Sequence, residues 1–312
     1  MQAPFDILPF LEKYISPEER FILACSTGPD SMFLLHQILK TPYKKNLVVA
    51  YFNHKIRVEA DEEEAFIEEL GKKEGFTVEI GSANIKALRE KYPSRSLEEL
   101  AREKRYQFFD ALLHIHTAKY ILTAHHLDDR IETFFFNMIR GTKLTWLINM
   151  TESSWALLRP LLGLEKKEIL EYLQTQNISF FLDSTNLDRD ITRNKMRLDI
   201  LPELEKINTN YKHNISQLFS YFEEIKSFLD MSVKEFLWNN DFFEIAEFER
   251  LSPLLQKEVI RYIYYISNKN STIGLSESNI EEILRFIRGK NNKTVKEIHG
   301  LKMKKDGKKI YF

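Results

Sequence analysis

Six residues with the sequence Ser-Thr-Gly-Pro-Asp-Ser, at positions 26–31, lie between a short apolar run and a pattern of helical period. The first N–H groups of a helix have no partner inside it, and together with the helix dipole they bind anions. Gly28 lets the backbone approach a ligand closely, and Pro29 suits the first helical turn. The stretch predicts a phosphate-binding loop made by Ser26, Thr27, Gly28, Pro29, Asp30 and Ser31. An ordinary turn with Asp30 or Ser26 as N-cap explains it equally well.

Asp30 is the unusual member of this loop, because a carboxylate repels a phosphate unless a cation lies between them. A Mg²⁺ ion that bridges Asp30 and the phosphates would remove this repulsion. The loop matches neither the Gly-Lys-Ser/Thr pattern nor the Gly-x-Gly-x-x-Gly pattern of other nucleotide sites. The sequence therefore predicts a metal held by Asp30.

A second polar stretch, His-His-Leu-Asp-Asp-Arg-Ile-Glu at 125–132, also follows an apolar run and enters a helix. Asp128, Asp129 and Glu132 fall within one helical turn, where acids cap a helix favourably. Two histidines and three acids are more than capping requires. The stretch predicts a site for a metal or for the ammonium group of a cationic substrate, although its spacing does not suit a closed tetrahedral zinc site.

Further polar residues carry weaker signals. Arg193 and Arg197 are neighbours on a predicted helix and suit a phosphate or a developing negative charge, but a solvated basic face is the simpler interpretation. Asn53 and His54 end an apolar run and lie in a loop that can contact a nucleotide. Arg105 lies on a helix whose charges also fit an i,i+3 ladder.

The elements that must position these residues alternate along the first two thirds of the chain. Strand-like apolar runs end near residues 26, 53, 80 and 125, and helical patterns follow them, one opened by a Ser96–Glu99 capping box. This alternation predicts an α/β fold, a parallel Rossmann-like sheet covered by helices. Ligands of such sheets bind at the carboxyl ends of the strands, where the polar stretches fall.

Beyond residue 165 the pattern is mostly helical, and its periodicity breaks at 206–210. We expect a first domain over residues 1–208, which carries the predicted phosphate-binding loop, and a smaller, mainly helical domain over 209–312. The second domain ends in short alternating segments rich in lysine. Clustered lysines contact phosphates without reading sequence, so we expect RNA contacts from Lys304, Lys305, Lys308 and Lys309, although such a run is also typical of a solvated face.

Composition sets the outer limits. The chain has 312 residues, of which 43% are hydrophobic and 29% charged, as in globular proteins. No apolar run approaches the roughly 20 residues that span a bilayer, and the first residues do not resemble a signal peptide, so we expect a cytoplasmic protein without membrane contact. The single cysteine, Cys25, excludes an intramolecular disulfide and a four-thiolate zinc site. The formal net charge of −1 restricts nucleic-acid binding to local patches.

Together, these stretches resemble the tRNA(Ile)-lysidine synthases, N-type ATP pyrophosphatases with an adenine nucleotide alpha hydrolase-like fold. The resemblance covers residues 21–202, and the order and spacing of its motifs are more specific than any one of them. These motifs lie at residues 26–31, 52–57, 99–106, 122–133, 140–141, 159–162, 183–186 and 193–197. The segment after 212 resembles the family's tRNA-binding domain, and the chain resembles the shorter members that lack a further C-terminal domain.

The resemblance implies a reaction in two steps. The oxygen of the wobble cytidine in the CAU anticodon of the minor isoleucine tRNA attacks the α-phosphorus of ATP, and pyrophosphate leaves. The ε-amine of free L-lysine then attacks carbon 2 of the base, AMP leaves, and the lysidine formed changes codon recognition from AUG to AUA. A homodimer is left open.

The same resemblance implies the roles of the site residues. The loop at 26–31 holds the pyrophosphate, and Asp30 holds Mg²⁺. The nucleotide is contacted by Asn53, His54 and Arg105. Lysine is bound by His125, Asp129 and Glu132, and Arg197 stabilises charge on the phosphates.

Two departures from the family bear on these roles. Thr27 stands where the family usually has glycine, and a threonine is strained there if its φ is positive. The glycines that often follow Arg140-Gly141 are replaced in residues 142–150, which affects the detailed contact with tRNA or nucleotide.

Three alternatives belong to other classes. Sulfur insertion into tRNA needs a cysteine in a loop, and Cys25 ends a predicted strand. Ligases that use ammonia or glutamine usually bring a glutaminase or an ammonia channel, and the sequence has no matching nucleophile. The position of Thr27 also motivates a nucleotide-binding module without turnover.

Overall fold

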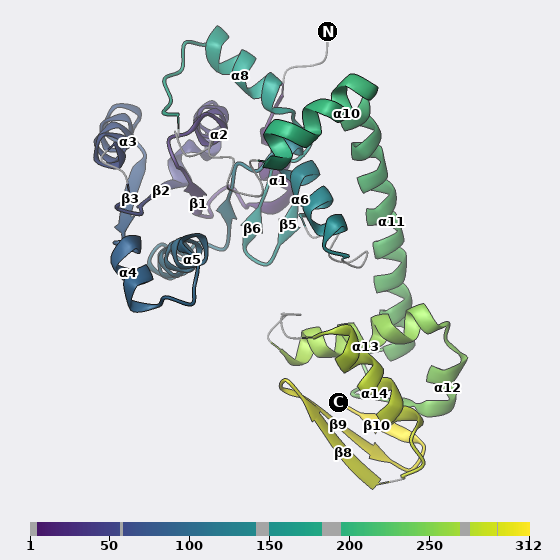
Figure 1. Ribbon diagram of the computed structural model, residues 1–312. Helices are drawn as coiled ribbons and strands as arrows, with labels where there is room; N and C mark the ends of the chain where they lie inside the picture. Colours follow the sequence, from purple (N-terminus) through teal and green to yellow (C-terminus); the bar gives the residue numbers. More distant parts are fainter. Residues whose placement is uncertain (1–4, 57–58, 142–149, 183–194, 269–274, 292) are drawn as a thin grey trace. The chain divides into compact units, whose positions relative to one another are not determined.

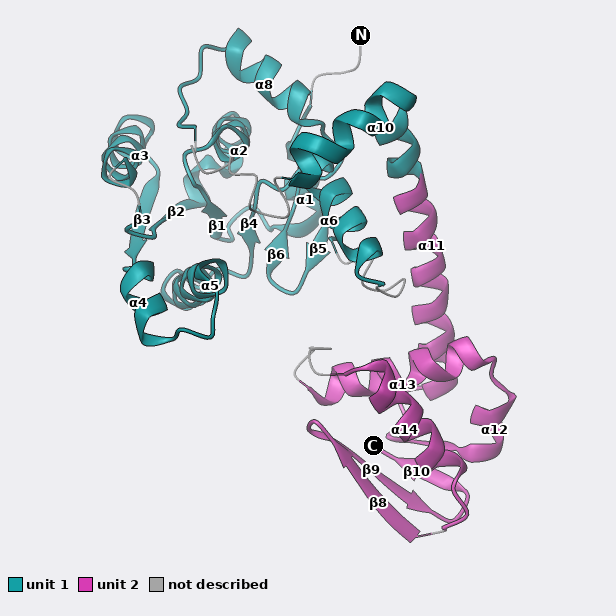
Figure 2. Ribbon diagram, viewed as in Figure 1, with its two compact units in different colours: residues 1–217 teal, residues 218–312 magenta. Residues whose placement is uncertain are grey.

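The computed structural model describes residues 5–56, 59–141, 150–182, 195–268, 275–291 and 293–312 (Figure 1). The chain divides into two compact units, residues 1–217 and 218–312, shown in separate colours in Figure 2. The division falls inside the long helix α11 (Tyr211–Leu237), whereas the sequence places a domain boundary at 208/209. The roles of the two domains stay predictions.

The first unit is built on a six-stranded sheet in the order β3-β2-β1-β4-β6-β5. Every neighbouring pair in it is parallel except β5 and β6, which form an antiparallel hairpin. The predicted parallel α/β architecture is confirmed, and the hairpin is an addition that the sequence pattern did not reveal. The strands are β1 (Phe21–Ala24), β2 (Leu47–Asn53), β3 (Thr77–Ser82), β4 (Ile121–Leu122), β5 (Ser153–Ser154) and β6 (Leu157–Leu158).

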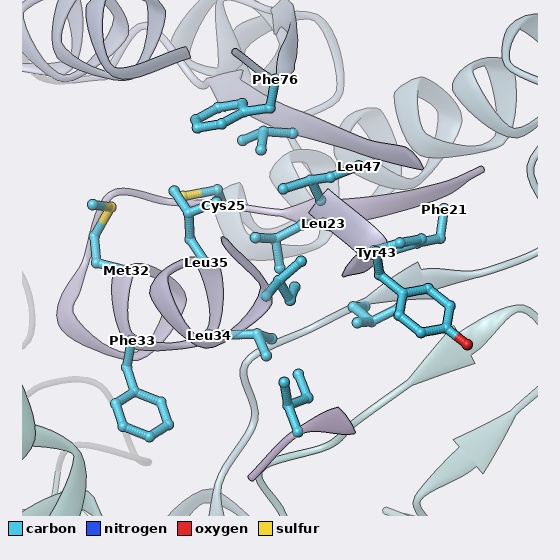
Figure 3. Packing of buried hydrophobic residues seen from close by; sticks show 14 of the residues in the cluster. Phe21, Leu23, Cys25, Met32, Phe33, Leu34, Leu35, Tyr43, Leu47 and Phe76 are labelled. Carbon is cyan, nitrogen blue, oxygen red and sulfur yellow. The ribbon is translucent and has the colours of Figure 1, made fainter. Parts of the chain in front are cut away.

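Helices cover both faces of this sheet. Successive residues of a strand point to opposite faces. Accordingly, Phe21 and Leu23 of β1 join the core of α2 (Pro29–Leu39), which Figure 3 shows, whereas Ile22 between them packs with Phe109 of α5 (Leu97–Ile115). Burial on both faces explains why the strand is continuously apolar. Each fully buried side chain of this kind stabilises the unit by about 1.5–3 kcal/mol.

The direction of α5 brings its first turns to the functional edge of the sheet. The helix begins at the predicted capping box, in which Ser96 Oγ accepts from Glu99 N and Glu99 accepts from Ser96 N. Because α5 leads into β4, which is parallel to β1, the helix runs against the strands. Its N-terminal half therefore lies at their carboxyl ends, where ligands of such sheets bind.

The remaining helical segments of the first unit connect or cover the strands. Near the candidate site, α6 follows β4 and α8 follows β6. A turn of π-helix, Met196–Ile200, leads directly into α10. The segments are α1 (Leu8–Tyr14), the 3-10 helix Pro42–Asn46, α3 (Ala60–Glu74), α4 (Ile85–Lys91), α6 (Leu127–Ile139), α8 (Lys166–Thr175) and α10 (Leu201–Ile207).

The second unit packs helices on an antiparallel sheet in the order β7-β10-β9-β8. Its helices are the end of α11, α12 (Ile245–Arg250), α13 (Pro253–Ser267) and α14 (Glu277–Arg288), and its strands are β7 (Phe242–Glu244), β8 (Lys293–Ile298), β9 (Leu301–Asp306) and β10 (Lys309–Tyr311). Among the helices described in either unit, none is both long and apolar enough to cross a bilayer.

Lys305 differs from the lysines around it. It alternates along β9 with Lys304 and is buried beside Leu301 and Met303. Its ammonium donates to the carbonyl oxygens of Ile287, at 2.7 Å, and Gly289, at 2.6 Å, and so closes the C-terminus of α14. The RNA contact expected from Lys305 is therefore replaced by a structural role.

Candidate functional site

The loop at residues 26–31 is held by its own hydroxyl groups. Ser31 Oγ accepts from the backbone N–H of Ser26 at 3.2 Å and donates to the carbonyl of Gly28 at 3.0 Å. Gly28 is the N-cap of α2 and has no side chain with which to bond the first helical N–H groups. These N–H groups remain available to an anion, as the sequence predicted.

Thr27 is the strained member of the loop. Its φ is +57°, in the left-handed region, and its side chain is fully buried. For a residue other than glycine this conformation costs about 1–2 kcal/mol. The Thr27 hydroxyl donates to the carbonyl of Ser26 at 2.6 Å, and the Thr27 carbonyl accepts from Phe181 N at 3.0 Å. Thr27 therefore anchors the loop from its buried side, and its side chain does not occupy the exposed side of the loop.

Asp30 meets a residue to which the sequence did not point. Its Oδ1 lies 2.5 Å from Lys166 Nζ, at the first turn of α8, and 3.6 Å from His126 Nε2. Lys166 thus places an ammonium group directly beside the predicted phosphate loop. No sequence signal pairs the two residues, which the fold brings together from distant parts of the chain.

The donor set fits a phosphate-bridged Mg²⁺ better than a metal held by protein alone. Among the described residues, no group of three or more His, Cys, Asp and Glu side chains is arranged to hold a metal ion. Mg²⁺ in nucleotide sites usually takes one or two carboxylates and completes its shell with phosphates and water. Asp30 supplies one such carboxylate at the start of α2, where the phosphates are expected.

His126 lies among acids. Its Nε2 is 3.4 Å from Asp129 Oδ2, and its Nδ1 is 3.6 Å from Asp128 Oδ2, ionic contacts longer than good hydrogen bonds. Burial lowers the pKa of His126, but Asp128, Asp129 and Asp30 outweigh it, and the net shift is upward. The backbone N–H of His126 donates to Asp129 at 3.0 Å, so the acid also caps α6.

His125 has the opposite surroundings. Burial lowers its pKa to about 4, and the nearby cations Arg159 and Arg105 act in the same direction against the pull of Asp129. Its Nδ1 is 2.9 Å from Thr123 Oγ1. At neutral pH this imidazole is uncharged.

Glu132 and Arg197 form an ion pair with two hydrogen bonds. Arg197 Nε donates to Glu132 Oε1 at 2.6 Å and Nη2 to Oε2 at 3.1 Å, while Nη2 also lies 3.4 Å from Asp129 Oδ1. Glu132 is buried, and burial raises its pKa although Arg197 opposes the shift. The structure thus brings together the three residues that the sequence assigned separately to lysine and to phosphates.

A cavity of about 220 Å³ opens beside this pair. Lys212, at the start of α11, reaches into it and binds Asp128 Oδ1 at 2.6 Å and Glu165 Oε2 at 3.2 Å. Burial alone would raise the pKa of Asp128, but His126, Lys212 and a backbone N–H hold it far below its usual range. The cavity is lined by His126, Asp128, Glu132, Lys166, Arg197, Leu201, Pro202, Glu205, Tyr211 and Lys212. Its mixed charge suits a zwitterionic amino acid.

Asn53 is the last residue of β2 and His54 follows it, at the end of the predicted strand. The Asn53 amide donates to Asp61 Oδ1 and Glu64 Oε2, both at 3.0 Å, and its carbonyl oxygen accepts from Lys55 N at 2.8 Å. The Asn53 side chain is therefore fully used in holding the turn into α3. The nucleotide contacts of Asn53 and His54 stay predictions, as does that of Arg105 on α5.

Several predicted motif residues lie outside the described part of the chain. They are Arg57, residues 142–149, Asp183–Asn186, Arg193 and Asn194. Conversely, sequence reasoning missed Lys166 and Lys212, and it gave no role to His126, which lies within 3.6 Å of three acids. The role of His125 in binding lysine stays a prediction. Lys166 begins the predicted helix that follows the Arg159 motif, and this position is a faint indication of a place in the site. Nothing in the sequence around Lys212 indicates a role in the site.

Most of the chain is similar to known proteins. The model of the PP-loop domain family matches residues 5–204. A tRNA(Ile)-lysidine synthase of Bacteroides thetaiotaomicron is 32% identical over 235 residues, 73% of this chain and 54% of that protein. A tRNA(Ile)-lysidine synthase of Caldanaerobacter subterraneus is 29% identical over 315 residues, 95% of this chain and 67% of that protein. The chain spans about half the length of the first of these relatives.

Among solved structures, a U34-tRNA thiolase of Methanococcus maripaludis superposes with a TM-score of 0.56 at 16% identity. The match covers 68% of this chain and 75% of the thiolase. At this identity the likeness supports the fold and carries nothing about the reaction.

Proposed function

Because this chain belongs to the PP-loop domain family, we propose that it is a cytoplasmic, ATP-dependent ligase that attaches free L-lysine to carbon 2 of the wobble cytidine in the CAU anticodon of the minor isoleucine tRNA. AMP and pyrophosphate are released and lysidine is formed. One structural observation carries the proposal. The phosphate loop and the acid cluster, far apart in the sequence, meet where Asp30 Oδ1 lies 3.6 Å from His126 Nε2.

In the first step the wobble cytidine oxygen attacks the α-phosphorus of ATP. The free N–H groups at the start of α2 face the pyrophosphate that leaves, and they stabilise the charge that grows on it. Lys166 Nζ lies 2.5 Å from Asp30. When ATP binds, this ammonium group can exchange its contact with the carboxylate for one with a phosphate oxygen. Asp30 would hold Mg²⁺, which would supply further charge neutralisation.

In the second step the ε-amine of lysine attacks the activated base and must first lose a proton, because a free lysine amine has a pKa near 10.4. Glu132 is the best-placed acceptor, since burial raises the pKa of its carboxyl group. The incoming ammonium competes with Arg197 for Glu132, and the displaced guanidinium becomes available to the phosphates. Asp129 lies in the same site, with its Oδ1 3.4 Å from Arg197 Nη2, and offers a second carboxylate to the ammonium group.

The tRNA is also held through the exposed lysines of the second unit. Lys302 and Lys304 lie on the solvent face of β9, whereas Lys305 is buried. Replacing both exposed lysines with glutamine should weaken tRNA binding and flatten its salt dependence, because fewer counterions are released, and leave ATP binding unchanged. Unchanged tRNA affinity in a filter-binding titration would contradict this role.

The direct test of the reaction is an incubation of the protein with ATP, labelled lysine and the minor isoleucine tRNA. Label should enter the tRNA with one AMP released per lysine. A transcript with uridine at the wobble position should remain unlabelled. Asp30→Asn should abolish labelling, whereas Asp110→Asn, an exposed acid on α5, should not change it. ATP binding without any labelling would instead favour a module without turnover.

The same assay distinguishes sulfur insertion. Cys25 is buried, its Sγ lies 3.6 Å from Ser31 Oγ, and burial raises the pKa of its thiol. A buried, protonated thiol is a poor sulfur carrier. Cys25→Ser should therefore retain lysine transfer, and no labelled sulfur should enter the RNA.

A further inference from the structure

Three arginines gather at the carboxyl edge of the sheet in the first unit. Arg102 and Arg105 lie in the N-terminal half of α5, which runs against the strands. Arg159 directly follows β6. Within the described ranges, none of the three forms an ion pair with a carboxylate.

The contacts of the three guanidinium groups are few. Arg159 Nη1 donates to the carbonyl of Thr151 at 2.8 Å, and its Nε is buried without a hydrogen-bond partner. Arg102 lies over the ring of Tyr106, 4.7 Å from its centroid. Arg102 and Arg105 lie one helical turn apart on α5, and Leu157, two residues before Arg159, packs in the same apolar cluster as Tyr106 of α5. Burial lowers the pKa of both Arg105 and Arg159, and Arg102 acts in the same direction, whereas Tyr106 and, for Arg105, Glu98 oppose the shift.

Arg105 and Arg159 are partly buried, whereas Arg102 is exposed. Partly buried charges without a counterion cost free energy, and a bound anion removes that cost. Guanidinium groups match phosphate oxygens in a two-pronged geometry. The cluster therefore has the composition of a phosphate site and not of a structural ion-pair network.

The two neighbouring histidines mark the border of this cationic region. The charges of Arg159 and Arg105 act on His125 against that of Asp129, whereas Asp30, Asp128 and Asp129 all lie within 3.6 Å of His126. The acids around His126 suit the lysine substrate and the metal, and the loop at the start of α2 is available to the pyrophosphate. Arg102 and Arg159 are therefore available to a different anion.

We propose that Arg102 and Arg159 bind a phosphodiester of the RNA substrate beside the nucleotide that reacts, next to Arg105, whose contact with ATP stays a prediction. The inference rests on the proposed function for the identity of the RNA. The binding itself is measured without ATP or lysine, so that it does not depend on the ligase reaction.

The test is a double variant, Arg102→Gln with Arg159→Gln, in the full chain. The probe is an unmodified transcript of the minor isoleucine tRNA, titrated at several KCl concentrations. Affinity should fall about tenfold or more, and the slope of log K against log[KCl] should decrease by about 0.7–0.9 for each phosphate that the variant no longer neutralises. The ATP dissociation constant should not change. The matched control replaces Arg20 and Lys119, which precede β1 and β4 at the opposite edge of the sheet, with glutamine and should leave both affinities unchanged.

Stability separates this outcome from misfolding. The variant removes two positive charges and the hydrogen bond from Arg159 to the Thr151 carbonyl, so its melting temperature should stay close to that of the wild type. Arg159→Lys keeps the charge without the two-pronged geometry and should bind tRNA with intermediate affinity.

Two results would overturn the proposal. Weaker ATP binding with unchanged tRNA affinity would assign the cluster to the nucleotide, and unchanged affinity for both ligands would show that the cluster binds neither. A third outcome separates the two proposals. If the wild type never transfers lysine but the double variant still loses RNA binding, this site is supported and the proposed function is refuted.

Discussion

Arg197→Met tests how the site holds Glu132. The substitution removes two charge-assisted hydrogen bonds, at 2.6 and 3.1 Å, from a carboxylate that is 6% exposed. Such bonds contribute about 1.5–3 kcal/mol each, but Arg197 is 41% exposed and solvent screens it. We expect a net loss of about 2 kcal/mol in the free energy of unfolding at pH 8.

The loss should depend on pH. The pKa of Glu132 in the folded protein is already above its ordinary value, and removing Arg197 raises it further. A carboxyl group of this kind is protonated at low pH, where it is tolerated in a buried site, and destabilises the fold as pH rises through its folded pKa. The deficit of Arg197→Met relative to the wild type should therefore shrink to about 1 kcal/mol or less near pH 5.

Urea unfolding followed by circular dichroism at both pH values measures this difference. The double variant with Glu132→Gln has no carboxyl group to titrate, so its stability difference from the wild type should vary less with pH than that of Arg197→Met. A deficit of Arg197→Met that is equal at pH 5 and pH 8 would refute the reasoning, because it would show that Glu132 does not carry the effect.

Three further substitutions test other contacts. Lys166→Met should weaken ATP·Mg²⁺ binding about tenfold in calorimetry, because its ammonium lies 2.5 Å from Asp30, whereas Lys167→Met on the exposed side of α8 should have no effect. Lys305→Met should lower the stability of the second unit by about 1–3 kcal/mol, because two buried carbonyls lose their donor, while Lys304→Met should leave it unchanged. His125→Gln should preserve the shape of the pH–rate profile between pH 6 and 9, since the pKa of His125 is about 4 and the group does not titrate there; a shifted profile would count against that assignment.

The sequence predicted those parts of the fold whose signals are local. The apolar runs at β1 and β2 and the Ser96–Glu99 capping box are complete within a few residues, and the structure forms them. The hairpin β5–β6 was missed because strands of two residues have no periodicity to read. The alternation of Leu301, Met303 and Lys305 already placed Lys305 on the buried face, a signal that the interest in basic charge obscured.

The sequence predicted which residue types make up the site but not which of them contact one another. The loop at 26–31 and the acids of 125–132 are recognisable by residue type, whereas the contacts of Lys166 with Asp30 and of Lys212 with Asp128 depend on tertiary structure. The dipeptide His125-His126 contains nothing that distinguishes its members. Burial lowers the pKa of His125, and Arg159 and Arg105 add to that shift, whereas the acids around His126 outweigh burial and raise its pKa.

The central claim is that the turn at the start of α2 grips a triphosphate while AMP passes to a nucleobase. It is measured most directly with ATP labelled at the α-phosphorus and the minor isoleucine tRNA, in the absence of lysine. We expect label to enter the RNA and added lysine then to discharge it as AMP. Release of labelled AMP or ADP at the same rate without RNA, with no label ever found on the tRNA, would contradict the claim.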